Sequence, residues 1–159
     1  MALGPLDGLT VVDLFSGSGS LGIEALSRGA AFAHFVDADR QSRAITESNI
    51  AKLGIASRTK AWMLQLPRGL KHLAEPLAAA RLVLADPPYG GDDARAVLEG
   101  LGRQGVLAPG TRVVLERHAK DVVPETVGVL VRSRERRYGE TVVDLYEARE
   151  GAPTREDLA

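Results

Sequence analysis

Four consecutive residues, Asp86-Pro87-Pro88-Tyr89, combine groups that could position an amine for chemistry. Two prolines remove two backbone N–H donors, so the Asp86 carboxylate and the Pro87 carbonyl form a cluster of acceptors. These acceptors can hold both hydrogens of an exocyclic amine on a nucleobase, while the Tyr89 ring offers a stacking face. The nitrogen lone pair then points outward, toward an electrophile held in line. A plain strand exit, with Asp86 as a cap and the prolines as breakers, would use the same four residues.

A second motif indicates where that electrophile would be held. The turn Gly17-Ser18-Gly19-Ser20-Leu21-Gly22 follows the apolar segment 9–15 and opens a helical pattern that ends at Gly29. Strand, glycine turn and helix N-terminus together indicate a nucleotide-cofactor site, because glycine lets the backbone approach a ligand and the helix offers free N–H groups. The glycine pattern alone also fits a nicotinamide dinucleotide. Asp13 is poorly placed for a pyrophosphate but suits the ammonium group of a methionine moiety.

Two further strand ends extend the cofactor site. Segment 33–36 is expected to form a strand, and Asp37 at its end can take both ribose hydroxyls of a nucleotide. Asp39 is the expected N-cap of the helix that follows. A strand over residues 59–63 leads to Gln65, which could accept a hydrogen bond from an adenine amine. These positions predict a complete nucleoside site along one edge of the sheet.

Helical patterns separate the strands, as in a parallel α/β sheet. One helix is expected over residues 40–53, and a short one over residues 68–73 is limited by Pro76. The apolar run 82–85 reads as a buried strand that delivers the tetrapeptide to the carboxyl edge of the sheet, where open α/β sheets bind ligands. A helix capped by Asp92 or Asp93 follows.

The last third of the chain predicts an antiparallel hairpin. Strands are expected over residues 111–115, 127–131 and 141–146, with a turn near Tyr138-Gly139. The hairpin turn is expected to carry four arginines: Arg132, Arg134, Arg136 and Arg137. If the first hairpin strand runs parallel to the others, these side chains lie on the rim of the tetrapeptide and face an anionic substrate. An edge strand kept soluble by charge would look the same.

Length and composition restrict the remaining possibilities. With 159 residues, of which 45% are hydrophobic, the chain predicts one domain over residues 1–150 and a disordered polar tail over residues 151–159. Because the sequence has no cysteine, a covalent thiolate route is excluded, and the three scattered histidines show no metal-ligand spacing. The net charge of −1 gives no global sign of nucleic-acid binding. The first residues show no export signal, so a cytoplasmic protein is expected.

Together, Asp13, the glycine turn, Asp37 and the tetrapeptide resemble the class I S-adenosylmethionine-dependent methyltransferases that methylate amino groups. More narrowly, the segments 13–29 and 137–141 are similar to the RsmD family, and the resemblance covers about residues 7–148. Members of that family methylate N2 of a guanine in bacterial small-subunit ribosomal RNA. The tetrapeptide alone is shared with adenine-N6 and cytosine-N4 enzymes, so the long segment at the glycine turn carries the narrower resemblance.

The resemblance implies a Rossmann-like fold in the α/β class, with a seven-stranded, mostly parallel sheet, an antiparallel last strand and helices on both faces. It implies S-adenosylmethionine as cofactor, no metal, and 16S rRNA as partner, within the small subunit or an assembly intermediate. The implied catalytic residues are Asp86, Pro87, Pro88 and Tyr89. The implied cofactor-binding residues are Asp13, Phe15, Ser16, Gly17, Ser18, Gly19, Asp37, Gln65 and Leu66. The implied substrate-binding residues are Arg134, Arg136, Arg137 and Tyr138.

Two features depart from the family pattern. Members usually carry a basic segment before the first strand, which this sequence does not show, and often an acidic residue where Gln65 stands. Two other functions therefore stay open: an adenine-N6 methyltransferase acting on RNA or DNA, and a non-catalytic module that binds S-adenosylmethionine or RNA. A nicotinamide-dependent oxidoreductase is a third alternative, which Asp13 and the proline pair disfavour.

Overall fold

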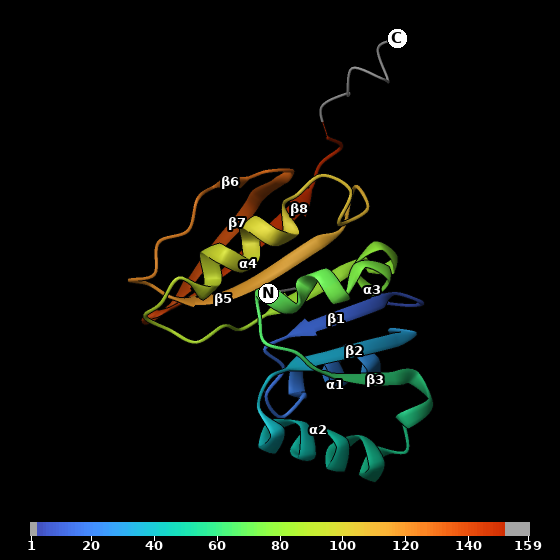
Figure 1. The fold of residues 1–159 in the computed structure, drawn as a ribbon. Helices are drawn as coiled ribbons and strands as arrows, with labels where there is room; N and C mark the ends of the chain where they lie inside the picture. The colour runs from blue at the N-terminus through green and yellow to red at the C-terminus, as the bar shows by residue number, and fades with distance from the viewer. Residues whose placement is uncertain (1–2, 152–159) are drawn as a thin grey trace.

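The glycine turn and the tetrapeptide both follow strands at the centre of one eight-stranded sheet (Figure 1). The computed structural model describes residues 3–151. Its strand order is β3-β2-β1-β4-β5-β8-β7-β6. The strands are β1 (Thr10–Leu14), β2 (Phe32–Asp37), β3 (Thr59–Met63), β4 (Leu82–Ala85), β5 (Arg112–His118), β6 (Thr126–Val127), β7 (Leu130–Tyr138) and β8 (Thr141–Ala148).

The first five strands run parallel to one another. Helices and short 3-10 turns connect them: α1 (Ser20–Ser27), α2 (Arg40–Leu53), η1 (Ala56–Arg58), η2 (Arg68–His72), α3 (Ala74–Ala79) and α4 (Asp93–Leu101). The side chain of Asp39 caps α2 by accepting a hydrogen bond from the Ser42 N–H at 3.1 Å, as the sequence predicts. Every residue of β4 is buried, as expected for a central strand covered on both faces.

The antiparallel part begins at β8, which lies between β5 and β7 and runs against both. Strand β7 therefore has the same direction as the parallel strands, and its carboxyl end lies on the edge where β1 and β4 end. The sequence analysis expects the arginines of the hairpin to lie on the rim of the tetrapeptide if this strand runs parallel to the others, and it does. The two residues of β6 extend the sheet at this side.

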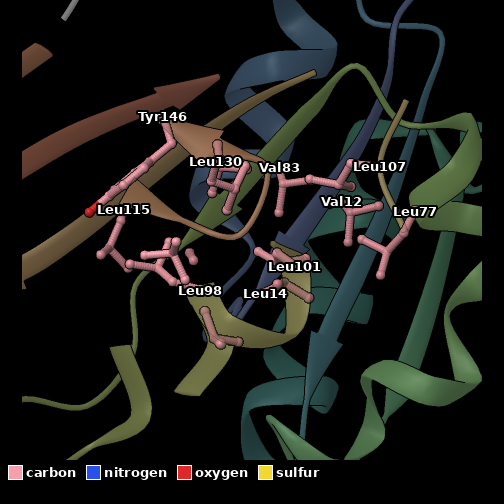
Figure 2. Close-up of a cluster of buried hydrophobic side chains, with 14 of the residues drawn as sticks. Val12, Leu14, Leu77, Val83, Leu98, Leu101, Leu107, Leu115, Leu130 and Tyr146 are labelled. Carbon is pink, nitrogen blue, oxygen red and sulfur yellow. The ribbon is translucent and has the colours of Figure 1, made fainter. Parts of the chain in front are cut away.

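Two hydrophobic clusters lie on opposite faces of the sheet, because successive side chains of a strand alternate between faces. One cluster joins Leu14 and Val83 to α3 and α4, and Figure 2 shows these side chains in contact across the two layers. The other joins Val11 and Leu82 to α1 and α2. The predicted mostly parallel sheet with helices on both faces is thereby confirmed.

Several boundaries differ from the sequence prediction. The sheet has eight strands rather than seven, because a turn at Gly128 separates β6 from β7 within the single strand expected over residues 127–131. Pro76 does not limit a helix but lies in the first turn of α3, where its missing N–H has no intrahelical partner. Strand β5 continues to His118. The expected tail, apart from Gly151, lies outside the described residues.

Candidate active site

The glycine loop (residues 15–22) and the proline loop (residues 86–90) meet at the same edge of the sheet. They follow β1 and β4, which are adjacent and in register, with Asp13 opposite Leu84 and Leu14 opposite Ala85. The Asp86 N–H lies 3.4 Å from the Leu14 carbonyl oxygen, so the first residue of the proline loop still pairs with β1. The sequence prediction that two distant motifs share one rim is confirmed by this register.

Side chains from neighbouring elements fix the backbone of the glycine loop. The Asp37 carboxylate accepts hydrogen bonds from the Gly17 N–H and the Asp39 N–H, both at 2.9 Å. Thr46 on α2 donates from its hydroxyl to the Gly17 carbonyl at 2.8 Å. Asn49 donates to the Ser18 carbonyl at 3.1 Å. The loop conformation is thus set from β2 and α2.

The glycines themselves allow an unusually close approach of α1 to β2. A Cβ on Gly22 would lie 2.5 Å from a ring carbon of Phe35, and Gly19 has a φ of 83°, which favours glycine. Phe15, which opens the loop, also has a positive φ, 57°. Positive φ at a bulky residue is uncommon and is often found where a backbone serves a ligand.

Asp13 is a buried carboxylate that is only half satisfied. It is 1% exposed; its Oδ2 accepts from the Gly22 N–H at 3.1 Å, while Oδ1 has no partner among the described residues. Burial, with smaller contributions from the charges of Asp86 and Asp37, raises the pKa of Asp13 to about 7. An ammonium group would supply both the donor and the positive charge that Asp13 lacks. The site therefore fits the amino acid end of S-adenosylmethionine.

The loop after β3 completes this side of the site. The Leu64 N–H donates to the Asp37 carbonyl at 3.2 Å, which holds the start of the loop against the end of β2. Gln65 is exposed and Leu66 is buried. The Leu66 side chain belongs to the hydrophobic cluster of Leu14 and Val83, so of the two predicted residues only Gln65 presents an exposed side chain.

The proline loop is more exposed than the glycine loop. The Asp86 side chain reaches solvent, yet loss of part of its water, together with the charge of Glu116, raises its pKa to about 6. Tyr89 is 49% exposed, and its hydroxyl donates to the Glu116 carboxylate at 3.2 Å. The ring of His118 meets the Tyr89 ring edge-on, with centroids 5.7 Å apart. Strand β5 therefore supports the tetrapeptide from one side.

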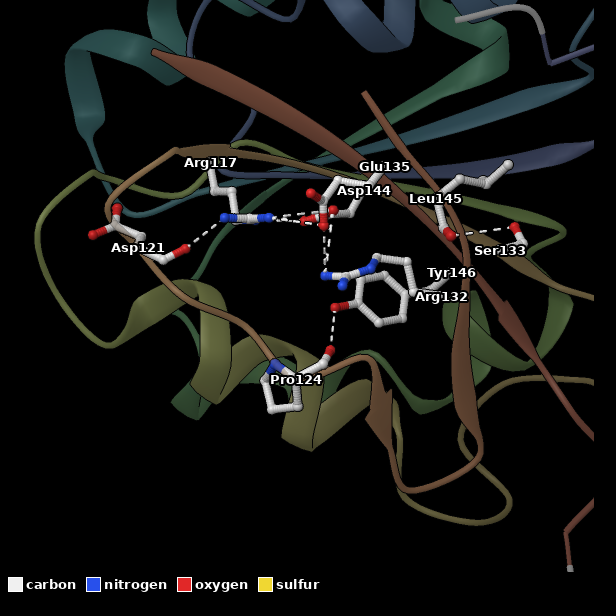
Figure 3. A network of polar contacts seen from close by, with 9 residues as sticks. All are labelled: Arg117, Asp121, Pro124, Arg132, Ser133, Glu135, Asp144, Leu145 and Tyr146. Carbon is white, nitrogen blue, oxygen red and sulfur yellow. Dashed lines mark hydrogen bonds and ion pairs between the residues drawn. The ribbon is translucent and has the colours of Figure 1, made fainter. Parts of the chain in front are cut away.

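A buried ion pair anchors the segment that holds the end of the proline loop. Arg117 and Asp144 are 2.6 Å apart, and Figure 3 shows the Arg117 guanidinium between Asp144 and the backbone of Asp121. Arg117 donates to the Asp121 carbonyl at 2.9 Å. The Asp121 carboxylate in turn accepts from the Gly90 N–H at 3.0 Å. A continuous chain of polar contacts thus links the buried pair to the residue after Tyr89.

The four predicted substrate-binding residues all lie in β7, exposed, rather than in the hairpin turn. They divide between two faces of the sheet. Arg134 pairs with Leu145 and Arg136 with Val143, and Val143 lines the same cavity as Glu116. Arg137 pairs with the buried Val142 and so lies on the α4 side. Tyr138 is at the carboxyl end of the strand, 54% exposed.

Comparison with known proteins identifies the family. Residues 2–147 match the family model described as Conserved hypothetical protein 95. The chain belongs to this family. YlbH of Bacillus subtilis is 36% identical over 148 residues, which cover 92% of this chain and 80% of YlbH. Ribosomal RNA small subunit methyltransferase D of Escherichia coli is 28% identical over 136 residues, covering 86% of this chain and 67% of the relative.

Solved structures agree with this assignment. A conserved hypothetical protein of Streptococcus pyogenes superimposes with a TM-score of 0.80 at 32% identity and covers 93% of this chain and 90% of its own. The methyltransferase yhhF of Escherichia coli gives a TM-score of 0.76 at 27% identity, over 91% of this chain and 78% of yhhF. The predicted family is thereby confirmed, and the names of the Bacillus subtilis and Escherichia coli relatives are those of rRNA methyltransferases.

Sequence reasoning missed several residues that this family member uses to build the site. Gly22 was part of the glycine motif, and its packing against Phe35 could have been anticipated from the third glycine of that motif. Glu116 stood at the end of an expected strand, but nothing in the sequence connected it to Tyr89. Nothing in the sequence pointed to Thr46 or Asp121.

Among residues 3–151, no helix is both long and apolar enough to cross a bilayer.

Proposed function

We propose that this chain transfers a methyl group from S-adenosylmethionine to the exocyclic N2 amine of a guanine in bacterial 16S rRNA. The observation that carries the proposal is the register of β1 and β4, which brings Asp13 and Asp86 to one edge of the sheet. These strands are adjacent in space, although β2 and β3 lie between them in the sequence. One carboxylate suits the cofactor ammonium and the other suits the substrate amine. The name of the Escherichia coli relative, a small-subunit rRNA methyltransferase, supports the choice of RNA.

The residues of the chain have separable tasks in this reaction. Asp13 would hold the cofactor ammonium, Asp37 the ribose hydroxyls, and Gln65 with Leu66 the adenine. Phe15, Ser16, Gly17, Ser18 and Gly19 would line the cofactor through their backbone. When bound, S-adenosylmethionine supplies a methyl group on a positive sulfur, so the N–C bond forms as the C–S bond breaks and its electron pair stays on sulfur.

The proline loop prepares the amine. Asp86 and the Pro87 carbonyl accept its two hydrogens, and Pro88 holds the turn. This orientation exposes the nitrogen lone pair, and after transfer the nitrogen loses one proton to reach neutrality. The Asp86 carboxylate is the nearest acceptor for that proton. Because the pKa of Asp86 is about 6, methyl transfer should rise with pH through that value as Asp86 ionises.

Substitution of Asp86 by Ala tests the mechanism. We expect the variant to lose at least 100-fold in methyl transfer, because the amine is no longer oriented, while S-adenosylmethionine binds with normal affinity. The measurement is transfer of tritium from labelled cofactor into small subunits that lack the modification, together with calorimetry of cofactor binding. Asp92→Ala is the matched control, since Asp92 is an exposed carboxylate in the same connection whose side chain makes no cap hydrogen bond.

Digestion of the labelled RNA to nucleosides identifies the base. N2-methylguanosine is the expected product, and N6-methyladenosine would replace this proposal by the adenine-N6 alternative. An Asp86→Ala variant with near-normal turnover would remove Asp86 from the mechanism. Cofactor binding without any transfer to subunits or free rRNA would favour the non-catalytic module.

A further inference from the structure

Glu116 stands beside Asp86 on the neighbouring strand. In the register of β4 and β5, Leu84 lies opposite Val114 and Ala85 opposite Leu115, so the next residues along the chain are Asp86 and Glu116. Leu84, Val114 and Glu116 line one cavity of about 250 Å³ on the α1 side of the sheet. The cavity ends at Ala85, the residue before the proline loop, and its charged lining residues are Glu116 and, from α1, Glu24 and Arg28.

One oxygen of this carboxylate is anchored and the other is available. The Tyr89 hydroxyl donates to Glu116 Oε1 at 3.2 Å, and no hydrogen bond within residues 3–151 occupies Oε2. The strand register places Glu116 next to Asp86, and the charge of Glu116 contributes to the raised pKa of Asp86. Two ionised carboxylates present acceptor oxygens and no donor.

That arrangement discriminates among nucleobases. The N2 amine of guanine is flanked by two ring nitrogens, N1 and N3, and the base can enter with its N1 edge toward Glu116 while Asp86 and the Pro87 carbonyl hold the amine. In guanine that nitrogen, N1, carries a hydrogen and is a donor. In adenine and cytosine the corresponding nitrogen carries a lone pair, which a carboxylate would leave unpaired or repel.

We propose that Glu116 is the residue that selects guanine, by accepting the N1–H of the base whose N2 amine is held at Asp86. The inference rests on the proposed function and adds a residue that determines its specificity. The base would be turned out of its RNA stack and enter the cavity edge with its Watson–Crick side toward the two carboxylates.

Strand register adds a site for the RNA backbone. Glu116 lies opposite Val143 on β8, and Val143 lies opposite Arg136 on β7, so the three residues form one row across the sheet. Two strand spacings separate Glu116 from Arg136, about 10 Å. A phosphate next to the inserted base can therefore meet the Arg136 guanidinium, while the base meets Glu116.

Replacement of the target guanine by 2-aminopurine tests the selection. This base keeps the N2 amine, has a lone pair at N1 and carries a hydrogen in place of O6. The part of the preference that depends on the N1–H is therefore measured by comparing wild type with the Glu116 variants below. Wild type is first used to map the methylated guanine, and small subunits are then reconstituted with 2-aminopurine at that position. We expect wild type to prefer guanine by about 10- to 100-fold in kcat/KM, the range of one well-formed base contact.

Glu116→Gln should reduce that preference to within a few-fold, because the glutamine amide can donate to an N1 lone pair. Glu116→Asp keeps a carboxylate and should retain the preference at lower kcat/KM, so it serves if the Gln variant does not fold. Tyr89→Phe removes the hydrogen bonds of the Tyr89 hydroxyl to Glu116 Oε1 and to Thr141, keeps the Glu116 carboxylate and should also retain the preference. Glu99→Gln, which alters an exposed carboxylate paired with Arg95 on α4, is the matched control.

The outcomes separate two failures. If wild type forms N2-methylguanosine but Glu116→Gln keeps the full preference for guanine, the role of Glu116 is overturned and the proposed function stands. Equal loss of preference in Glu116→Gln and Tyr89→Phe also overturns that role, since Glu116 would then act only by holding Tyr89. A wild-type product other than N2-methylguanosine overturns the proposed function and this inference together.

Discussion

The glycine loop and the proline loop serve one site but are held in different ways. The glycine loop is fixed by buried contacts: Asp13 accepts the Gly22 N–H, and a side chain at position 22 would collide with Phe35. The proline loop is exposed and is supported from one side, by Glu116 at Tyr89 and by Asp121 at Gly90. One loop is part of the core and the other rests on its surface.

This difference separates stability from activity. A change in the glycine loop disturbs packing, so it should alter the free energy of unfolding as well as cofactor binding. A change at the proline loop breaks exposed polar contacts of small energetic value and should alter mainly the methyl transfer. A cofactor of fixed shape suits a rigid site, whereas an RNA base must enter and leave. Substitutions at matched positions in the two loops test whether stability and activity are separated in this way.

Asp13→Asn should give the largest effect, with opposite signs for stability and binding. The folded-state pKa of Asp13, about 7, is above its ordinary value of 3.8, so folding favours the protonated form. The contribution of Asp13 to the free energy of unfolding is fully present below about pH 4 and is lost as the pH rises through 7. At pH 8 the neutral Asn should stabilise the cofactor-free protein by up to about 4 kcal/mol, while binding of S-adenosylmethionine weakens because the charge partner of the ammonium is gone.

Urea denaturation of both proteins at pH 5 and pH 8 measures the first effect, and calorimetry measures the second. Asp86 contributes pH dependence of the same sign, but it is present in both proteins and cancels in their difference. If the free energy of unfolding depends on pH equally in wild type and variant, burial does not raise the pKa of Asp13. The glycine loop would then not be part of the buried core.

Adding a methyl group by Gly→Ala substitution in each loop region should change the free energy of unfolding by the next largest amount. In Gly22→Ala the new Cβ would lie 2.5 Å from Phe35 and 3.2 Å from the Asp13 carboxylate, so we expect a loss of about 2 kcal/mol in the free energy of unfolding. In Gly91→Ala, just after the proline loop, the Cβ would meet nothing within 4 Å. We expect a change within about 0.5 kcal/mol there. Similar losses at both positions would contradict the comparison.

The sequence predicts the glycine loop better than its partner, for a physical reason. The glycine loop depends on local pattern: an apolar strand, glycines at fixed spacing and a helix over consecutive residues. Asp13 could be assigned from its position relative to Gly17. The helix cap at Asp39 is equally local, since the side chain bonds only three residues ahead. Contacts of short sequence separation leave a signature that can be read without coordinates.

The supports of the proline loop are remote in sequence. Tyr89 and Glu116 are 27 residues apart, and Gly90 and Asp121 are 31 apart. Their meeting depends on the register of β4 and β5 and on the path of the chain after β5, a segment for which the sequence analysis gives no helix or strand. Arg136 and Arg137 lie on opposite faces because successive residues of a strand alternate. The irregular pairing between Arg132 and Arg134 is what the sequence does not reveal, and it places these two arginines on opposite faces although they are two residues apart.

Asp121→Ala should have the smallest effect on stability and a selective effect on activity. It removes the acceptor of the Gly90 N–H and leaves the buried Arg117–Asp144 pair intact, so the free energy of unfolding should fall by less than about 1 kcal/mol. The proline loop loses its support beyond Tyr89, and methyl transfer should fall about 10-fold because the amine is oriented less often. Asp121→Asn keeps an acceptor oxygen in place and should recover most of the rate.

Affinity for S-adenosylmethionine should equal that of wild type in both variants, because the glycine loop is fixed from β2 and α2. If cofactor affinity falls together with methyl transfer, the two loops are coupled through β1 and β4, and the separation of stability from activity does not hold.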